Sequence, residues 1–158
     1  MRLIFLFILF LIVTSCKGPD LADPISVDLN GDMIADLDGN PWSSGSENSA
    51  TINYLSNEIH VEGYLSSDGI IRNHISLIVK ETSEGTFNSQ IAKGTYYDVQ
   101  SKSTFVSSNN CNVDILNLDL NAKLISGTFS FNALPLDSGE SIEVLNGEFN
   151  NVNLRIVE

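Results

Sequence analysis

The chain is short of basic residues, and this shortage limits what it can bind. Its 158 residues contain 8 Lys+Arg against 20 Asp+Glu, which gives a formal net charge of −12. Nucleic acids and anionic headgroups repel such a surface, and no Lys/Arg cluster offsets the repulsion. We therefore expect no nucleic-acid partner, and we expect the acidic surface to keep the chain soluble and monomeric.

The sequence also has no hydrophobic run long enough to span a bilayer. Its longest run, residues 3–13, has 11 apolar residues, whereas a transmembrane helix needs about 20. Arg2 precedes this run and small residues follow it. The arrangement is typical of a secretory signal peptide, so we predict a leader over residues 1–15.

The residues that follow the run resemble a bacterial lipobox. Val13, Thr14 and Ser15 supply one aliphatic and two small residues before Cys16. In lipoproteins with this motif, the cysteine thiol receives diacylglycerol, the leader is removed, and the new amino terminus is usually acylated. Two or three acyl chains anchor a protein stably, at about 0.8 kcal/mol per buried CH₂. The resemblance implies a lipid anchor at Cys16 in the cell envelope, at the outer membrane; losing Arg2 takes the net charge from −12 to −13.

The sequence has only two cysteines, Cys16 and Cys111. A lipid on Cys16 leaves Cys111 without an intramolecular disulfide partner, and we predict a partly buried structural thiol there. Residues 16–31 carry prolines and aspartates without periodicity, which predicts an acidic tether behind the anchor. A single domain then remains, over residues 32–158.

The pattern from residue 32 onward is that of β-strands. Short segments alternate apolar and polar residues, and turn formers such as Asp-Gly and Asn-Gly separate them. No segment shows a sustained helical period. We predict an all-β domain, an antiparallel β-sandwich or barrel of about nine or ten short strands. The alternating segments span residues 50–55, 58–65, 70–80, 95–99, 103–107, 112–119, 123–133, 141–145 and 148–156.

Glycines recur two positions before aromatic residues in these segments. Glycine in a strand allows a neighbouring side chain to approach the backbone closely. We therefore predict that rings from adjacent strands cover the bare glycine backbone as part of the core. The triplets are residues 85–87, 94–96, 127–129 and 147–149.

Three segments resemble a family of uncharacterised Bacteroidota lipoproteins. Residues 35–42 read Ala-x-x-Asp-Gly-x-x-Trp, residues 127–131 read Gly-x-Phe-x-Phe, and residues 146–149 read Asn-Gly-x-Phe. The resemblance covers most of residues 32–152, although Ser-Ser-Gly at 43–45 departs from the pattern. It implies an all-β, lipid-anchored envelope protein built on a domain of unknown function, and it supplies no activity.

A calcium site is one interpretation of the acidic segment at the start of the domain. Asp28, Asn30, Asp32 and Asp36 place oxygen ligands as in the Ca²⁺ loops of integrin-like propeller repeats, which this segment resembles. Met33 stands where those loops usually have glycine, and the loop occurs once. The other interpretation is an acidic tether that runs into the first strand.

Signals for catalysis are sparse. His60 and His74 lie in separate strand patterns and do not make a metal-binding pair, and His74 has no nearby cysteine or acid at ligand spacing. Carboxylates such as Asp114 or Asp119 could meet Glu143 across strands, but we expect solvated acids. The chain has no Gly-x-Ser-x-Gly elbow, no phosphate-binding glycine loop and no His-Glu-x-x-His motif. We therefore predict that the protein is not an enzyme and has no cofactor.

Two functions remain open. The first is a non-catalytic interaction or structural module of unknown partner. The second is a barrel that binds a small ligand or glycan at its mouth. In the second, five aromatic side chains would converge on the mouth: Trp42, Tyr54, Tyr64, Tyr96 and Tyr97.

Replacing the acylated cysteine tests the anchor. We expect Cys16→Ala to move the protein from the membrane fraction to the soluble fraction, because the thiol that carries the lipid is gone. Cell fractionation with immunoblotting measures this, and Cys111→Ala is the matched control that keeps the anchor. Persistence of Cys16→Ala in the membrane fraction would contradict the prediction.

Overall fold

The described residues form an all-β structure, as the sequence predicts. The computed structural model describes residues 31–137 and 139–158, and no helix in this part of the chain is long and apolar enough to cross a bilayer. The predicted leader, Cys16 and the tether up to residue 30 lie outside it. The ten strands are β1 (Met33–Leu37), β2 (Asn40–Ser43), β3 (Asn48–Asn53), β4 (Glu58–Ser67), β5 (Ile70–Val79), β6 (Gly85–Asn88), β7 (Ala92–Asp98), β8 (Ser103–Asp119), β9 (Leu124–Pro135) and β10 (Ile142–Val157).

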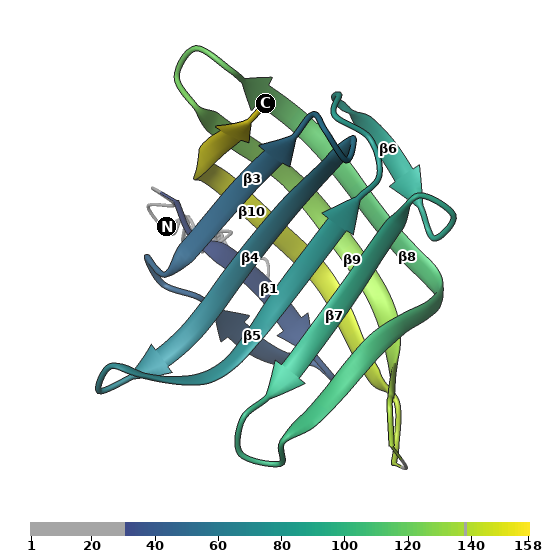
Figure 1. The fold of residues 1–158 in the computed structure, drawn as a ribbon. Coiled ribbons are helices and arrows are strands. Elements are labelled where there is room, and N and C mark those ends of the chain that lie inside the picture. Colours follow the sequence, from purple (N-terminus) through teal and green to yellow (C-terminus); the bar gives the residue numbers. More distant parts are fainter. Residues whose placement is uncertain (1–30, 138) are drawn as a thin grey trace, which may run out of the picture.

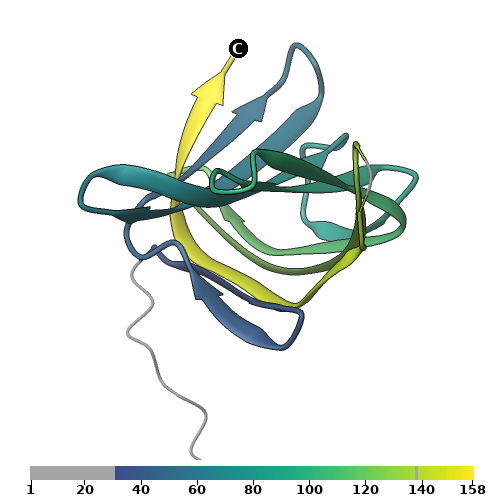
Figure 2. The ribbon, with the colours of Figure 1, turned by 90° about the horizontal axis from the view of Figure 1, so that it is seen from below.

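Seven of these strands close into a barrel (Figure 1, Figure 2). Antiparallel pairings join β3, β4, β5, β7, β8, β9 and β10 in that order around the ring. A parallel pairing between β10 and β3, which aligns Leu154 with Ala50, completes the ring. Of the two predicted architectures, sandwich or barrel, the chain therefore adopts the barrel.

The other three strands extend the barrel wall. The β1–β2 hairpin pairs with β10 through β1, and β6 pairs with β8. Trp42 of β2 is 5% exposed, and its indole Nε1 donates a hydrogen bond to Asn73 Oδ1 of β5 at 2.7 Å. These three strands have four or five residues each, and none of them is among the segments that the alternation of apolar and polar residues predicts.

Two strands are longer than the sequence pattern predicts. The alternation predicts β8 and β10 as two strands each, with turns at Asn109–Asn110 and Asn146–Gly147. Each of these turns is instead a β-bulge, where the register against β9 shifts and the strand continues. A bulge accommodates extra residues without reversing the chain, and it favours the same Asn and Gly residues as a turn.

Side chains fill the interior of the barrel. Phe129, Phe131 and Phe149 are exposed by only 4%, 1% and 1%, and Phe129 stacks on the other two at centroid distances of 6.3 and 6.4 Å. The Cys111 side chain is 1% exposed, so the predicted partial burial is in fact almost complete. Aliphatic side chains complete the core, among them Ile52, Ile59, Val61, Ile75, Leu77, Val79, Val113, Ile115, Ile125, Val144 and Val152.

Glycines make room for the three phenylalanine rings. A Cβ atom at Gly147 would lie 2.5 Å from the Phe129 ring, and one at Gly94 would overlap the Phe131 ring. A Cβ atom at Gly127 would lie 2.5 Å from Phe149 Cζ and would also overlap a backbone carbonyl oxygen of β8. The prediction that rings from neighbouring strands cover the strand glycines is confirmed at Gly147 and Gly127. At Gly94 of β7 the covering ring instead comes from β9, which lies beyond β8 in the ring.

Adding one methyl group at Gly127 tests this packing. The clash involves backbone as well as a ring, so neither side can move freely, and we expect Gly127→Ala to lower the free energy of unfolding by about 3 kcal/mol. Urea denaturation followed by circular dichroism measures the change. Gly139→Ala is the control, because the nearest atom to its new Cβ is Pro135 Cγ at 3.4 Å. Equal stability of the two variants would contradict the proposed packing.

Candidate functional site

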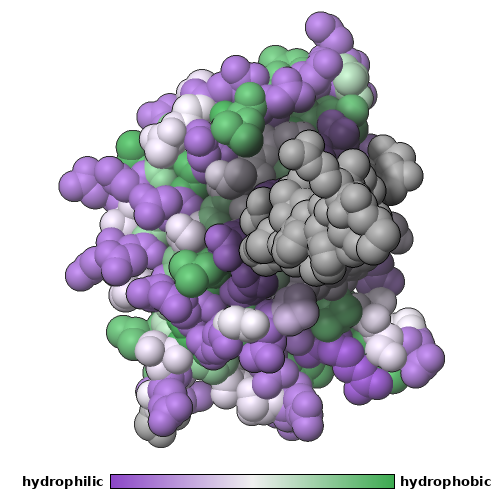
Figure 3. Space-filling view, turned by 180° about the vertical axis from the view of Figure 1, so that it is seen from behind, coloured by the Kyte–Doolittle hydropathy of each residue, from purple (hydrophilic) through white to green (hydrophobic). Residues whose placement is uncertain are grey.

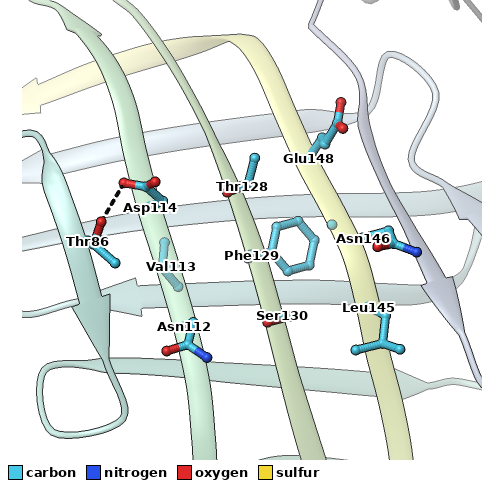
Figure 4. A pocket seen from close by; sticks show the side chains of 11 residues that line it. Thr86, Asn112, Val113, Asp114, Thr128, Phe129, Ser130, Leu145, Asn146 and Glu148 are labelled. Carbon is cyan, nitrogen blue, oxygen red and sulfur yellow. Dashed lines mark hydrogen bonds between the residues drawn. The ribbon is translucent and has the colours of Figure 1, made fainter. Parts of the chain in front are cut away.

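An open groove with a volume of about 430 Å³ crosses the outside of the barrel (Figure 4). We call it the outer groove. Strands β6, β8, β9 and β10 contribute its residues: Thr86, Asn112, Val113, Asp114, Thr128, Phe129, Ser130, Leu145, Asn146, Gly147 and Glu148.

The outer groove exists because the central strand has small outward-facing side chains. Thr128 and Ser130 of β9 form its floor, while larger side chains rise from β8 on one side and β10 on the other. Since adjacent strands lie about 4.8 Å apart, the two walls are about 10 Å apart. The outer groove is therefore a channel whose floor runs along β9.

The bulge in β10 shapes the second wall. Leu145 and Asn146 occupy the bulge and are both exposed, whereas Val144 and Gly147 on either side face the core. Asn146 has a φ of 49°, a left-handed conformation that asparagine tolerates better than most residues. Its side-chain Nδ2 donates to Asp36 Oδ2 of β1 at 2.8 Å. The bulge thus directs two consecutive side chains toward solvent at the groove.

The outer groove is negatively charged. Asp114 and Glu148 both align with Thr128, one from each wall. Asp114 Oδ1 accepts a hydrogen bond from Thr86 Oγ1 at 3.1 Å. None of the described residues that line the groove is Lys, Arg or His, so no cation within it offsets the two carboxylates.

The sequence did not identify the outer groove as a site. It raised a pairing of Asp114 or Asp119 with Glu143, but Glu143 pairs with Asn132 and Asp119 with Leu124. Alternation does predict that these side chains face outward. Which strands are neighbours depends on pairing between distant segments, and that information is absent from a local pattern.

The five predicted aromatic ligand residues lie in three separate places. Trp42 and Tyr96 both reach Asn73 inside one end of the barrel, where burial, and to a smaller extent Asp98, raise the pKa of Tyr96. Tyr54 is 43% exposed in the turn between β3 and β4. Consecutive residues of a strand point to opposite faces, so Tyr97 lies on the outside when Tyr96 lies inside. The chain does not bring the five rings to one mouth.

Tyr64 and Tyr97 instead flank a histidine on the outer surface. Tyr64, His74 and Tyr97 align across β4, β5 and β7, with ring centroids 5.3 and 5.6 Å apart. Burial lowers the pKa of His74. Burial and the hydrogen bond that Tyr64 Oη donates to Glu62 Oε2 at 2.7 Å raise the pKa of Tyr64 to about 12.

The predicted calcium ligands are only partly described. Asp28 and Asn30 lie outside the described residues, so the four-residue set stays a prediction. Asp32 precedes β1, and Asp36 is within it, bonded to Asn146. The described residues contain no group of three or more His, Cys, Asp or Glu side chains that could hold a metal ion.

Cys111 is buried in the core, and His60 lies beside an acidic side chain on the outside of the barrel. Burial raises the pKa of the Cys111 thiol, which disfavours the thiolate that a nucleophile requires. His60 Nε2 lies 3.2 Å from Glu58 Oε2 on the solvent side of β4. Beside it, Thr51, Asn53, Glu62 and Arg155 form a smaller hollow of about 310 Å³.

The Tyr64 hydroxyl provides a pH test of the outer aromatic row. Because its pKa is raised, the folded state keeps this proton up to about pH 12, and the stability it contributes is present below pH 10 and lost as the pH rises from 10 to 12. Subtracting the Tyr64→Phe titration curve at 295 nm from that of the wild type isolates the group. A midpoint near 10 while circular dichroism shows a folded protein would contradict this geometry, and Glu62→Gln should lower the midpoint.

Comparison with known proteins gives a family and no activity. The family model described as "Domain of unknown function (DUF6252)" matches residues 30–153. The curated proteins and the solved structures contain no match to the chain. The matched segment includes the barrel strands as far as Asn153 of β10 and all residues of the outer groove. The chain therefore belongs to the DUF6252 family, a family of unknown function.

Proposed function

We propose that this protein is a lipid-anchored bacterial envelope protein that acts as a non-catalytic interaction module. Diacylglycerol on Cys16 holds it at the outer membrane, as the lipobox resemblance implies, and a Bacteroidota source follows from the separate resemblance of residues 35–42, 127–131 and 146–149 to Bacteroidota lipoproteins. The barrel binds its partner on its outer surface, in the outer groove.

The filled interior is the observation that carries this proposal. Barrels that bind small ligands inside keep an internal cavity. Here the three stacked phenylalanines and the aliphatic side chains around them occupy the inside, with exposed fractions of 4% or less for the rings. A ligand therefore has to bind outside, and the outer groove is a hollow there that has residues from four strands and a carboxylate on each of its two walls.

The chemistry of the outer groove supports binding. Its polar side chains are hydroxyls, amides and carboxylates, which recognise a partner through hydrogen bonds and charge. A hydroxyl nucleophile is commonly activated by a histidine or lysine nearby, and the described lining residues include neither.

The length of the tether supports a barrel that stands away from the bilayer. Gly31 N–H donates to the Asn150 carbonyl oxygen at 3.0 Å, so the chain joins the barrel wall beside β10. The segment between Cys16 and Gly31, fully extended, would reach about 50 Å. Such a span would leave the outer groove accessible to other envelope molecules.

Photo-crosslinking in intact cells tests the proposed surface. A benzoylphenylalanine at Asn112, on the wall of the outer groove, should form a discrete adduct with a partner. The same residue at Lys93, on the solvent side of β7, is the control and should form none. Ser130→Trp, which fills the floor of the groove, should abolish the Asn112 adduct while the melting temperature stays unchanged. Equal adducts from Asn112 and Lys93, or an adduct that survives Ser130→Trp, would overturn the proposal.

A further inference from the structure

We infer that the outer groove binds an extended peptide segment of a partner protein that carries two adjacent Lys or Arg residues. This inference rests on the proposed function and adds the chemical class of the ligand. Its basis is the alignment of Asp114 and Glu148 on opposite walls of a channel one strand wide.

The shape of the outer groove fits an extended chain. Its floor follows β9 over the small side chains of Thr128 and Ser130, and walls about 10 Å apart confine a ligand on both sides. An extended chain lying along this floor points successive side chains to opposite sides. Residues i and i+1 of such a segment would therefore reach the two walls.

The charges on the two walls specify what those side chains should be. Asp114 and Glu148 align with the same floor residue, Thr128, so they lie at the same height along the channel. The described lining residues include no cation, and each carboxylate can therefore accept hydrogen bonds from a lysine ammonium or arginine guanidinium of the ligand. Two adjacent basic residues would complement both walls.

The remaining lining favours a peptide over a glycan. Phe129, the aromatic residue of the lining, is 4% exposed and faces the core, so it offers a sugar no ring face. Asn112 and Asn146 stand on opposite walls with side-chain amides that can both donate to and accept from a peptide backbone. Leu145, 39% exposed, adds an apolar contact on the β10 wall.

The protein's own tether is a poor occupant. Residues 17–30 contain one basic residue, Lys17, together with three aspartates, Asp20, Asp23 and Asp28. These acids would be repelled by the carboxylates of the outer groove. The occupant is therefore a segment of another protein, and opposite charge would also speed the encounter with an envelope protein whose net charge is −13 once the leader with Arg2 is removed from the chain of −12.

Binding of a defined peptide by the full chain in detergent tests the inference. The probe is a fluorescein-labelled Gly-Ser-Lys-Lys-Ser-Gly peptide, followed by fluorescence anisotropy at low salt; its Glu-Glu counterpart is the negative probe. We expect saturable binding that weakens with added salt. The double variant Asp114→Asn, Glu148→Gln should weaken it by about tenfold, and it keeps the groove's shape and the acceptor for Thr86.

The control variant is Glu140→Gln, which removes one exposed carboxylate from the β9–β10 connection, outside the groove. It should change the affinity less than about twofold, since a single exposed charge contributes little. Equal binding by the double variant and the wild type, an equal loss with Glu140→Gln, or equal binding of the Glu-Glu peptide would each overturn the inference. If any of these occurs while the Asn112 adduct still depends on Ser130, the outer groove stands as the binding surface and only its basic specificity falls.

Discussion

The packing of three phenylalanine rings against strand glycines is the constraint on which the rest of this barrel depends. A closed ring of seven strands encloses a limited space, and Phe129, Phe131 and Phe149 take up much of it. They fit only because Gly147, Gly94 and Gly127 lack the Cβ atoms that would meet them. Protein interiors are packed as densely as organic crystals, so a side chain at any of these glycines has nowhere to go.

This packing also bears on the proposed binding. Because the inside is full, the recognition that we propose uses the outside of the wall. β9 links the two surfaces: its alternate residues are large on the inner face, at Phe129 and Phe131, and small on the outer face, at Thr128 and Ser130. The outer groove thus lies directly over the stacked rings, and the two-residue period of one strand produces both.

The bulge of β10 likewise affects both the core and the outer groove, since Val144 and Gly147 beside it face inward and Leu145 and Asn146 within it face outward. Without extra residues, strict alternation would not place Gly147 opposite the Phe129 ring and also turn Leu145 and Asn146 outward. Outside its grey part, the face visible in Figure 3 shows hydrophilic residues with scattered hydrophobic ones. The recognition that we propose depends on the placement of individual charges, more than on a broad apolar patch.

Much of the architecture was predictable from local sequence. Alternation in β4, β5 and β9 predicted strands close to the observed ones, and Asp68-Gly69 marked a real turn. Asn146-Gly147 was wrongly predicted to be a turn between two strands, because a bulge within one strand favours the same residues as a turn. The five-residue aromatic site was predicted from residue type alone. Its members do not converge, because consecutive strand residues such as Tyr96 and Tyr97 face opposite sides of the barrel wall. Asp114 was considered beside Glu143 and not beside Glu148, because local alternation does not give the register between strands.

The sequence by itself determined the all-β class, and it predicted the glycine–aromatic packing; the single domain, the leader and the lipobox anchor remain predictions. Each of these follows from residues close together in the chain, where the two-residue period and runs of apolar side chains can be read directly. Only the tertiary structure decided that the sheet closes as a barrel, through the parallel pairing of β10 with β3. It alone placed Asp114 and Glu148 across one channel, because strand order and register arise from contacts between distant segments that compete for the same interior.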